Sequence, residues 1–301
     1  HNPKLEASYL KHLECTWGKG LDLNSLTIVV DCANGAGSRS APKALGRLGA
    51  KVIAIADEPD GENINRDCGS THPEALLDAV RTRKADLGIA LDGDGDRCLL
   101  VDEKGQLVDG DQILMVLALH GAAKKKLKDS RIVTTVMSNR GLHKALREAG
   151  ITLAEVGVGD RYVVEALRNE GLELGGEQSG HVILGPHNDF IGDGMVTALA
   201  VLRVLRETKK TLSELTAPFV RMPQVLLGVP VGSKPALDSI ENLGELLAAY
   251  NEELGQDGRI LLRYSGTENL ARVMVEGPDV DRIRTQAEDL AEVIRQAIGA
   301  R

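Results

Sequence analysis

Residues 87–97, LGIALDGDGDR, join a five-residue apolar run to three aspartates that alternate with glycines. A short apolar run bounded by a polar turn is typical of a buried β-strand. The aspartates would then lie in the loop after the carboxyl end of that strand. In folds built on parallel sheets, ligands bind at this edge. The stretch therefore predicts a strand followed by a polar binding loop.

Strand-like and helical patterns alternate on both sides of this stretch. Two apolar runs precede it, and helical patterns separate the three runs: strands at 27–30 and 51–56, helices at 41–50 and 73–85. This alternation predicts a parallel α/β sheet. The same order then recurs, with strands at 131–137, 151–158 and 172–175 and helices at 142–150 and 161–171. We therefore expect two related α/β domains with mixed parallel sheets.

From about residue 222 the pattern changes to a small α+β arrangement. It predicts strands at 224–231, 259–264 and 270–276, a helix at 235–253 and a final helix. The predicted fold class is thus α/β, with two related α/β domains plus a C-terminal α+β domain. The expected domain bounds are 4–107, 108–221 and 222–301.

Composition excludes several classes of function. The 301 residues are 43% hydrophobic but only 2% aromatic, so the cores must consist of Leu, Val, Ile and Ala. A net charge of −8 argues against nucleic-acid binding, where clustered Lys and Arg supply affinity. No apolar run approaches the roughly 20 residues that span a bilayer, so no membrane partner is expected. The cysteines lack metal-binding spacing and suit a reducing cytoplasm: Cys15, Cys32, Cys68 and Cys98.

The aspartate loop is the strongest chemical signal in the chain. Asp92, Asp94 and Asp96 can turn their carboxylates onto one point, which is costly unless a cation neutralises them. Hard oxygen ligands favour Mg²⁺ or Ca²⁺, and Mg²⁺ suits phosphoryl transfer, with Arg97 holding a phosphate. An EF-hand calcium loop is the rival, with Glu103 at position twelve. However, Arg97 stands where that loop needs glycine, and a strand precedes it. A solvated acidic turn is the remaining alternative.

Two further loops carry candidate binding residues. Residues 176–181, GEQSGH, follow an apolar run, and Glu177 and Ser179 can hydrogen-bond sugar hydroxyls. His181 suits a proton donor or a phosphate contact, although a polar turn with a surface histidine is an equal alternative. Residues 263–269, RYSGTEN, bridge two strands and offer a phosphate cradle or an ordinary hairpin turn. The cradle would consist of Arg263, Ser265, Gly266 and Thr267, with Arg272 just beyond.

The three loops, in this order and at these separations, resemble the metal, sugar and phosphate loops of the α-D-phosphohexomutase superfamily. Within it, Gln178 and the segments 137–139, 159–163 and 272–277 most resemble phosphoglucosamine mutases. The resemblance covers nearly the whole chain from residue 4. It departs from the family pattern at Asn269, where many members have proline, and at Gly157, where many have lysine.

The resemblance implies four domains, of which this chain matches the second, third and fourth. In the family a phosphoserine in the first domain stands directly before a His-Asn-Pro sequence. Here His1-Asn2-Pro3 has no serine before it and runs directly into Lys4. We therefore expect residues 1–3 to be a vestige of that loop and the first domain to be missing from a truncated chain. The resemblance assigns catalytic roles to His1 and Arg97.

The implied activity is that of an intramolecular phosphotransferase in the cytoplasm. The phosphoserine donates its phosphoryl group to a phosphorylated amino sugar, giving a bisphosphate, and the other phosphate then returns to serine. This interconverts glucosamine 6-phosphate and glucosamine 1-phosphate with the help of Mg²⁺. A phosphoglucomutase or phosphomannomutase and a non-catalytic sugar-phosphate-binding fragment are the alternatives. The sequence leaves both a monomer and a homodimer open.

Overall fold

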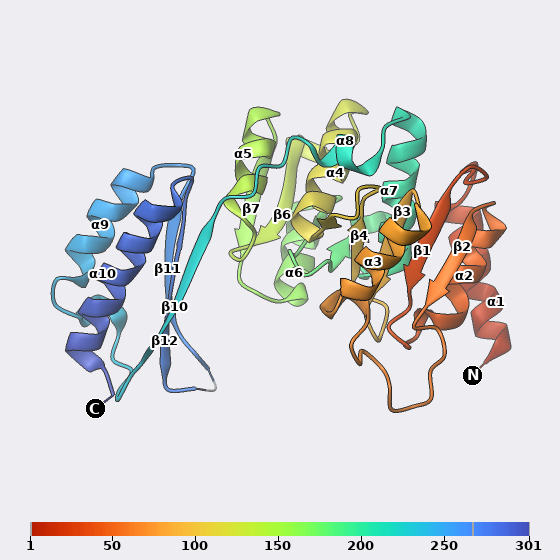
Figure 1. Cartoon of the computed structure of the whole chain (residues 1–301). Coiled ribbons are helices and arrows are strands. Elements are labelled where there is room, and N and C mark those ends of the chain that lie inside the picture. Colours follow the sequence, from red (N-terminus) through yellow and green to blue (C-terminus); the bar gives the residue numbers. More distant parts are fainter. Residues whose placement is uncertain (1, 267, 301) are drawn as a thin grey trace. The chain divides into compact units, whose positions relative to one another are not determined.

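The computed structural model describes residues 2–266 and 268–300, which fold into two compact units (Figure 1). The first unit runs up to Ser138 and resumes from Ala145 to Phe219. The second holds Asn139–Lys144 and the chain from Val220 onward. The short segment Asn139–Lys144 therefore belongs with a part of the chain that follows about 80 residues later.

The first sheet of the first unit has the strand order β2-β1-β3-β4-β5. Its three parallel strands are the apolar runs of the sequence, and two antiparallel strands follow: β1 Thr27–Asp31, β2 Lys51–Ile55, β3 Leu87–Leu91, β4 Cys98–Val101 and β5 Leu107–Val108. The accompanying helices are α1 Pro3–His12, α2 Gly37–Arg47 and α3 Glu74–Arg83. Every residue of β3 is buried, as its unbroken apolar pattern requires.

The second sheet of this unit, with the order β7-β6-β8-β9, repeats the topology of the first. Its strands are β6 Arg131–Thr135, β7 Thr152–Val156, β8 Gly175–Gly176 and, antiparallel, β9 Val182–Ile183. Its helices are α4 Gly110–Ala123, α6 Asp160–Glu170, α7 Gly194–Thr208 and α8 Leu212–Thr216. A further helix, α5 Arg140–Glu148, begins in the segment assigned to the second unit and ends in the first. Because α7 packs against β3, β4 and β9, it brings the two sheets together. The predicted α/β fold class, with two related mixed sheets, is confirmed.

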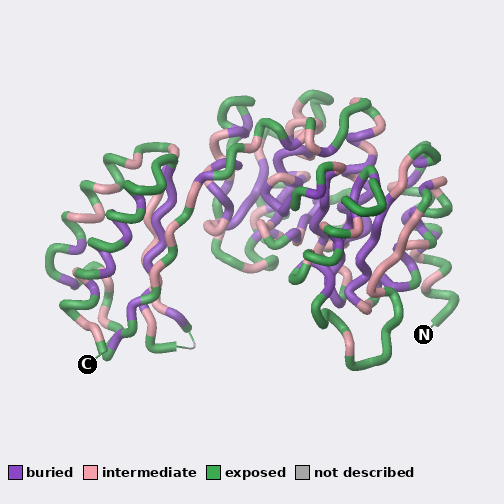
Figure 2. The backbone as a smooth tube through the Cα atoms, in the orientation of Figure 1, coloured by how far each residue is buried: buried purple, intermediate pink, exposed green. Residues whose placement is uncertain are grey.

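The second unit has a three-stranded antiparallel sheet in the order β10-β12-β11. The strands are β10 Gln224–Pro230, β11 Arg259–Tyr264 and β12 Leu270–Glu276, and the helices are α9 Leu243–Leu254 and α10 Val280–Ile298. The core contains strand residues such as Val229, Val273 and Val275 together with Leu290 and Ile294 of α10. Figure 2 shows buried and exposed positions alternating along α10, whereas α9 is mainly intermediate and exposed. The predicted α+β class is confirmed.

Two predicted elements differ from the structure. The strand expected at 172–175 is the two-residue β8, and the helix expected at 235–253 begins only at Leu243. Asn242 has a left-handed backbone (φ 64°), which interrupts helical geometry, and a 3₁₀ turn, Leu237–Ser239, precedes it. None of the helices in residues 2–266 and 268–300 is long and apolar enough to cross a membrane.

Candidate functional site

The three aspartates of the loop after β3 converge as predicted. Asp92, Asp94 and Asp96 each offer a carboxylate oxygen, and these oxygens lie within 4.8 Å of one another. Glu103, which a calcium loop would need, instead accepts hydrogen bonds from the backbone N–H and hydroxyl of Ser213. The loop also follows a strand. These observations favour a three-carboxylate cation site over the EF-hand alternative.

Asp92 is held as an anion inside the loop. It is only 1% exposed, and its Oδ1 accepts the N–H groups of Gly95 (3.2 Å) and Arg97 (3.1 Å). Its Oδ2 accepts the Arg97 Nε–H at 2.6 Å. Burial by itself would raise the pKa of Asp92, but the bonds and charge of Arg97 outweigh it and hold that pKa below its ordinary value.

Asp96 has the opposite environment. Its Oδ1 is buried and accepts no hydrogen bond from the described residues, although Nε of Arg97 lies 3.6 Å away. Its Oδ2 lies 3.8 Å from Nδ1 of His181. Burial, followed by the charge of Asp92, raises the pKa of Asp96 above its ordinary value. A buried carboxylate oxygen that accepts no hydrogen bond is costly. A divalent cation would supply what this oxygen lacks, so the three residues fit a metal site.

Close backbone contacts fix the shape of the aspartate loop. The N–H of Ala36 donates to the Gly93 carbonyl at 2.8 Å, and the N–H of Gly194 donates to the Gly95 carbonyl at 2.9 Å. A Cβ on Gly35 would lie 2.2 Å from the Gly93 oxygen, so only glycine permits this approach. Gly95 itself has φ +82°, a left-handed conformation that glycine adopts without strain.

The loop at 176–181 lies directly beside the aspartate loop. The Gly180 carbonyl accepts the N–H of Cys98, the first residue of β4, at 3.0 Å. His181 consequently reaches Asp96, while Ser179 is exposed. Glu177 Oε1 accepts the N–H of Gly159 at 3.1 Å, which ties this loop to the start of α6. The structure thus brings together two loops that are about 80 residues apart in the sequence.

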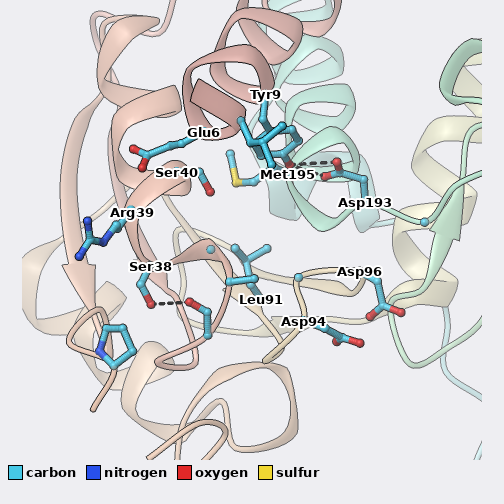
Figure 3. A pocket seen from close by; sticks show the side chains of 17 residues that line it. Glu6, Tyr9, Ser38, Arg39, Ser40, Leu91, Asp94, Asp96, Asp193 and Met195 are labelled. Carbon is cyan, nitrogen blue, oxygen red and sulfur yellow. Dashed lines mark hydrogen bonds between the residues drawn. The ribbon is translucent and has the colours of Figure 1, made fainter. Parts of the chain in front are cut away.

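A cavity of about 500 Å³ opens beside Asp94 and Asp96 (Figure 3). The residues that line the rest of this cavity were not predicted from the sequence. Ser38, Arg39 and Ser40 lie in the first turn of α2, and Tyr9 donates its hydroxyl to Asp193 at 2.9 Å. Burial, followed by the charge of Asp193, raises the pKa of Tyr9. No sequence motif marks these residues, because four separate segments supply them.

The second unit presents the loop expected to bind phosphate. The strand register places Arg263 directly opposite Arg272, a pairing of like charges that is unfavourable unless an anion neutralises it. Arg272 contacts Glu268 at 3.2 Å. Ser265 is buried, its N–H donates to the Leu270 carbonyl at 2.8 Å, and Gly266 is exposed. The predicted residues His1 and Thr267 lie outside the described residues.

Lys234 is a residue of this loop region that the sequence prediction missed. Its Nζ donates to the carbonyl of Ser265 and to the carbonyl of Glu268, each at 2.8 Å. Beside it, the Tyr264 hydroxyl donates to the Pro235 carbonyl at 2.8 Å. These bonds fix both ends of the exposed turn. An isolated lysine 30 residues upstream gives no signal of this role in the sequence.

Comparison with known proteins identifies the class. Three models of the phosphoglucomutase/phosphomannomutase family match the chain: α/β/α domain II at residues 7–105, α/β/α domain III at 109–222 and the C-terminal domain at 226–293. The chain therefore belongs to this family. The membership of the phosphohexomutase superfamily that was predicted from the three loops is confirmed.

Individual relatives within this family are phosphoglucosamine mutases. The chain is 47% identical over 97% of its length to a phosphoglucosamine mutase of Syntrophotalea carbinolica, and 50% identical over 97% to one of Renibacterium salmoninarum. It spans 64% of the length of each relative.

Solved structures share the fold. An Aspergillus fumigatus N-acetylphosphoglucosamine mutase, in complex with GlcNAc-6P and magnesium, has a TM-score of 0.75 at 20% identity over 96% of this chain and 70% of its own. A phosphoglucomutase/phosphomannomutase family protein of Burkholderia thailandensis has a TM-score of 0.77 at 23% identity over 97% of this chain and 64% of its own. At these identities the likeness concerns the fold alone.

Proposed function

We propose that this chain forms the metal-, sugar- and phosphate-binding part of a phosphoglucosamine mutase, which interconverts glucosamine 6-phosphate and glucosamine 1-phosphate. The observation that carries the proposal is the convergence of three carboxylates, with an Asp96 oxygen that accepts no hydrogen bond, beside the loop of His181. The similarity to phosphoglucosamine mutases over 97% of the chain supports it. Such a reaction also depends on a phosphoserine, and the chain spans 64% of the length of these relatives.

Asp92, Asp94 and Asp96 would hold Mg²⁺, whose chemistry is to neutralise negative charge on a transferring phosphoryl group. Arg97 keeps the loop in the shape that this requires, because its backbone and guanidinium both bind Asp92. Burial would lower the pKa of Arg97, but the carboxylates around it raise that pKa, so it stays charged. A permanent cation beside the metal suits the binding of a phosphate dianion.

The substrate contacts follow from the two other loops. Glu177 and Ser179 would bind sugar hydroxyls, and His181, between the sugar loop and Asp96, would donate a proton or contact phosphate. In the second unit, Arg263 and Arg272 would bind a phosphate, which relieves the repulsion between two arginines on adjacent strands. Ser265 and Gly266 would contribute to the same phosphate contact.

The test is a comparison of glucosamine 6-phosphate, glucose 6-phosphate and mannose 6-phosphate in the presence of Mg²⁺. Binding is measured by calorimetry and turnover by a coupled assay for the 1-phosphate. The expected result is Mg²⁺-dependent binding that is strongest for the amino sugar, and turnover once a phosphoserine-bearing domain is supplied with the chain. As a control, Asp78→Asn removes an exposed carboxylate of α3 away from the aspartate loop. This variant should behave like the unchanged chain in both measurements.

Each alternative function has its own outcome. Preference for glucose or mannose 6-phosphate would make the protein a phosphoglucomutase or phosphomannomutase, since Gln178 alone is the distinctive residue of the sugar loop. Binding that does not change with Mg²⁺, without turnover in any combination, would support a non-catalytic sugar-phosphate-binding protein. Either result would overturn the proposal.

A further inference from the structure

A second cavity, of about 490 Å³, lies in the first unit and shares no lining residue with the cavity beside Asp94 and Asp96. It lies among the π-helix Leu13–Trp17, α4, α7 and the segments before β8 and after β9. Its volume falls in the range of sites that bind small organic molecules. None of the three loops of the proposed mutase reaction contributes to it.

The lining of this cavity combines an apolar surface with a cationic rim. Aliphatic side chains form much of the wall: Leu117, Leu127, Leu174, Leu184, Ala200 and Val204. Lys124, Lys126 and Arg203 supply three positive charges against the two carboxylates of Glu173 and Glu207. Because the wall is apolar, a purely ionic ligand would not fit it. The surplus of cations favours a ligand that carries an acidic group.

Both carboxylates of the rim already have partners. Glu207 Oε2 lies 3.1 Å from Nζ of Lys124 and 3.2 Å from Nε2 of His120. Glu173 accepts the backbone N–H of Lys128 at 2.8 Å. The ammonium group of Lys126 has no ion-pair partner within the part of the chain that the structure describes.

Trp17 supplies an aromatic face and an unsatisfied donor. Its indole Nε1 is buried and has no hydrogen-bond partner among residues 2–266 and 268–300. Arg203 fixes the residue in place by donating to the Trp17 carbonyl at 2.6 Å. Trp17 also ends a single π-helical turn, a geometry that is frequent at functional sites. A buried N–H group without a partner is costly, and a ligand oxygen would satisfy it.

We propose that this cavity is a second binding site, for a small organic anion with a flat apolar body and one acidic group. The apolar body would pack against Trp17 and the leucines. The acidic group would lie near Lys126. The proposal does not depend on the mutase reaction, because it uses none of the residues assigned to that reaction.

The experiment uses Trp17, the only tryptophan of the chain, as a local reporter. The folded protein is titrated with 8-anilinonaphthalene-1-sulfonate, and energy transfer from tryptophan to the probe is followed. N-phenyl-1-naphthylamine, which has the same aromatic body without the sulfonate, is the matched probe. We expect saturable transfer at one site per chain for the sulfonate, and at least threefold weaker binding of the neutral probe.

Two variants and a control locate the site. Lys126→Ala changes an exposed residue and should weaken binding of the sulfonate probe about threefold, because one exposed ion pair contributes about this much. It should leave binding of the neutral probe unaffected. Ala200→Phe should fill the cavity and abolish transfer for both probes. Lys51→Ala, a change at an exposed lysine outside the cavity, should change neither. Absence of saturable transfer, equal affinity for the two probes, or unchanged sulfonate binding in Lys126→Ala would each overturn the proposal.

Discussion

Asp92 and Asp96 lie four residues apart, but their surroundings shift their pKa values in opposite directions. Asp92 has two N–H groups and a guanidinium around it, which outweigh the effect of its burial. Asp96 is influenced most by burial and next by the negative charge of Asp92. The loop therefore stabilises one carboxylate by itself and leaves the other to a cation. This asymmetry identifies Asp96 as the residue whose removal tests the metal site most directly.

The first prediction concerns Asp96→Asn, which keeps the size of the side chain and removes its charge. We expect the affinity for Mg²⁺ to fall by at least about tenfold, because even residues around a metal ligand typically affect affinity by 10–100-fold. Calorimetric titration of the chain with Mg²⁺ measures the effect. Asp78→Asn should bind Mg²⁺ like the unchanged protein. Equal Mg²⁺ affinity in the two variants would exclude Asp96 as a ligand.

The second prediction concerns the four thiols. Cys15 is exposed, whereas Cys32, Cys68 and Cys98 are buried. Burial, followed by the charges of Asp57 and Asp31, raises the pKa of Cys32 to about 12, so it stays protonated up to about pH 10. A thiol reagent at about pH 8 should modify one cysteine rapidly, and Cys15→Ser should remove this phase. Rapid modification of two or more thiols in the folded protein would contradict the buried placement.

At the scale of elements, the aspartate loop keeps its shape through contact with the loop after β1. Gly35 and Gly93 meet backbone to backbone, and the neighbouring Ala36 N–H completes the contact. A side chain at Gly35 would have to push the aspartate loop away, since a backbone oxygen cannot rotate aside. The position of the aspartates thus depends on a residue more than 50 positions earlier in the chain.

The third prediction is therefore that Gly35→Ala weakens Mg²⁺ binding several-fold and lowers the free energy of unfolding by about 1–3 kcal/mol, the usual cost of overpacking. Urea unfolding and Mg²⁺ titration measure the two effects. Gly46→Ala in α2 is the matched control, because a Cβ there meets nothing within 4 Å. It should be neutral or stabilising by up to about 1 kcal/mol. Similar behaviour of both variants would show that the close contact does not constrain the loop.

At the scale of the whole molecule, the second unit is assembled from two separate segments. Asn139, which is 1% exposed, accepts the N–H groups of Met222 and Gly141 and donates to the Met222 carbonyl. Nearby, the buried Glu276 accepts the N–H of Arg140 at 2.7 Å. The side chain of Asn139 thus joins the segment Asn139–Lys144 to the beginning of the C-terminal part of this unit.

The fourth prediction is that Asn139→Ala destabilises the second unit by at least about 2 kcal/mol, because it leaves buried backbone groups of Met222 unsatisfied. Circular dichroism reports unfolding of both units, whereas the fluorescence of Trp17 reports the first unit. The circular dichroism transition should begin at lower urea concentration, and the Trp17 transition should not move. Asn169→Ala, an exposed change in α6, is the control. An equal shift of both transitions would show that the chain unfolds as one unit.

Local sequence patterns determined most of the secondary structure and the chemistry of the loops. The hairpin strands Arg259–Tyr264 and Leu270–Glu276 have the predicted bounds, because a stretch with Ser, Gly and Asn separates two largely apolar runs. The aspartate loop was predictable because all three carboxylates belong to one short segment. The start of α9 was not predictable, because the left-handed backbone of Asn242 interrupts a sequence pattern that favours a longer helix.

Only the tertiary structure decided which residues meet across large sequence distances. Tyr9 binds Asp193 across 184 positions, and the register of two strands pairs Arg263 with Arg272. The lack of a hydrogen bond to the Asp96 oxygen is likewise a result of packing. The physical reason is that periodicity and turn chemistry act over a few neighbouring residues, whereas burial and side-chain contact depend on how whole elements pack. The sequence alone thus established the strands and the three loops, and packing established their neighbours and the second cavity.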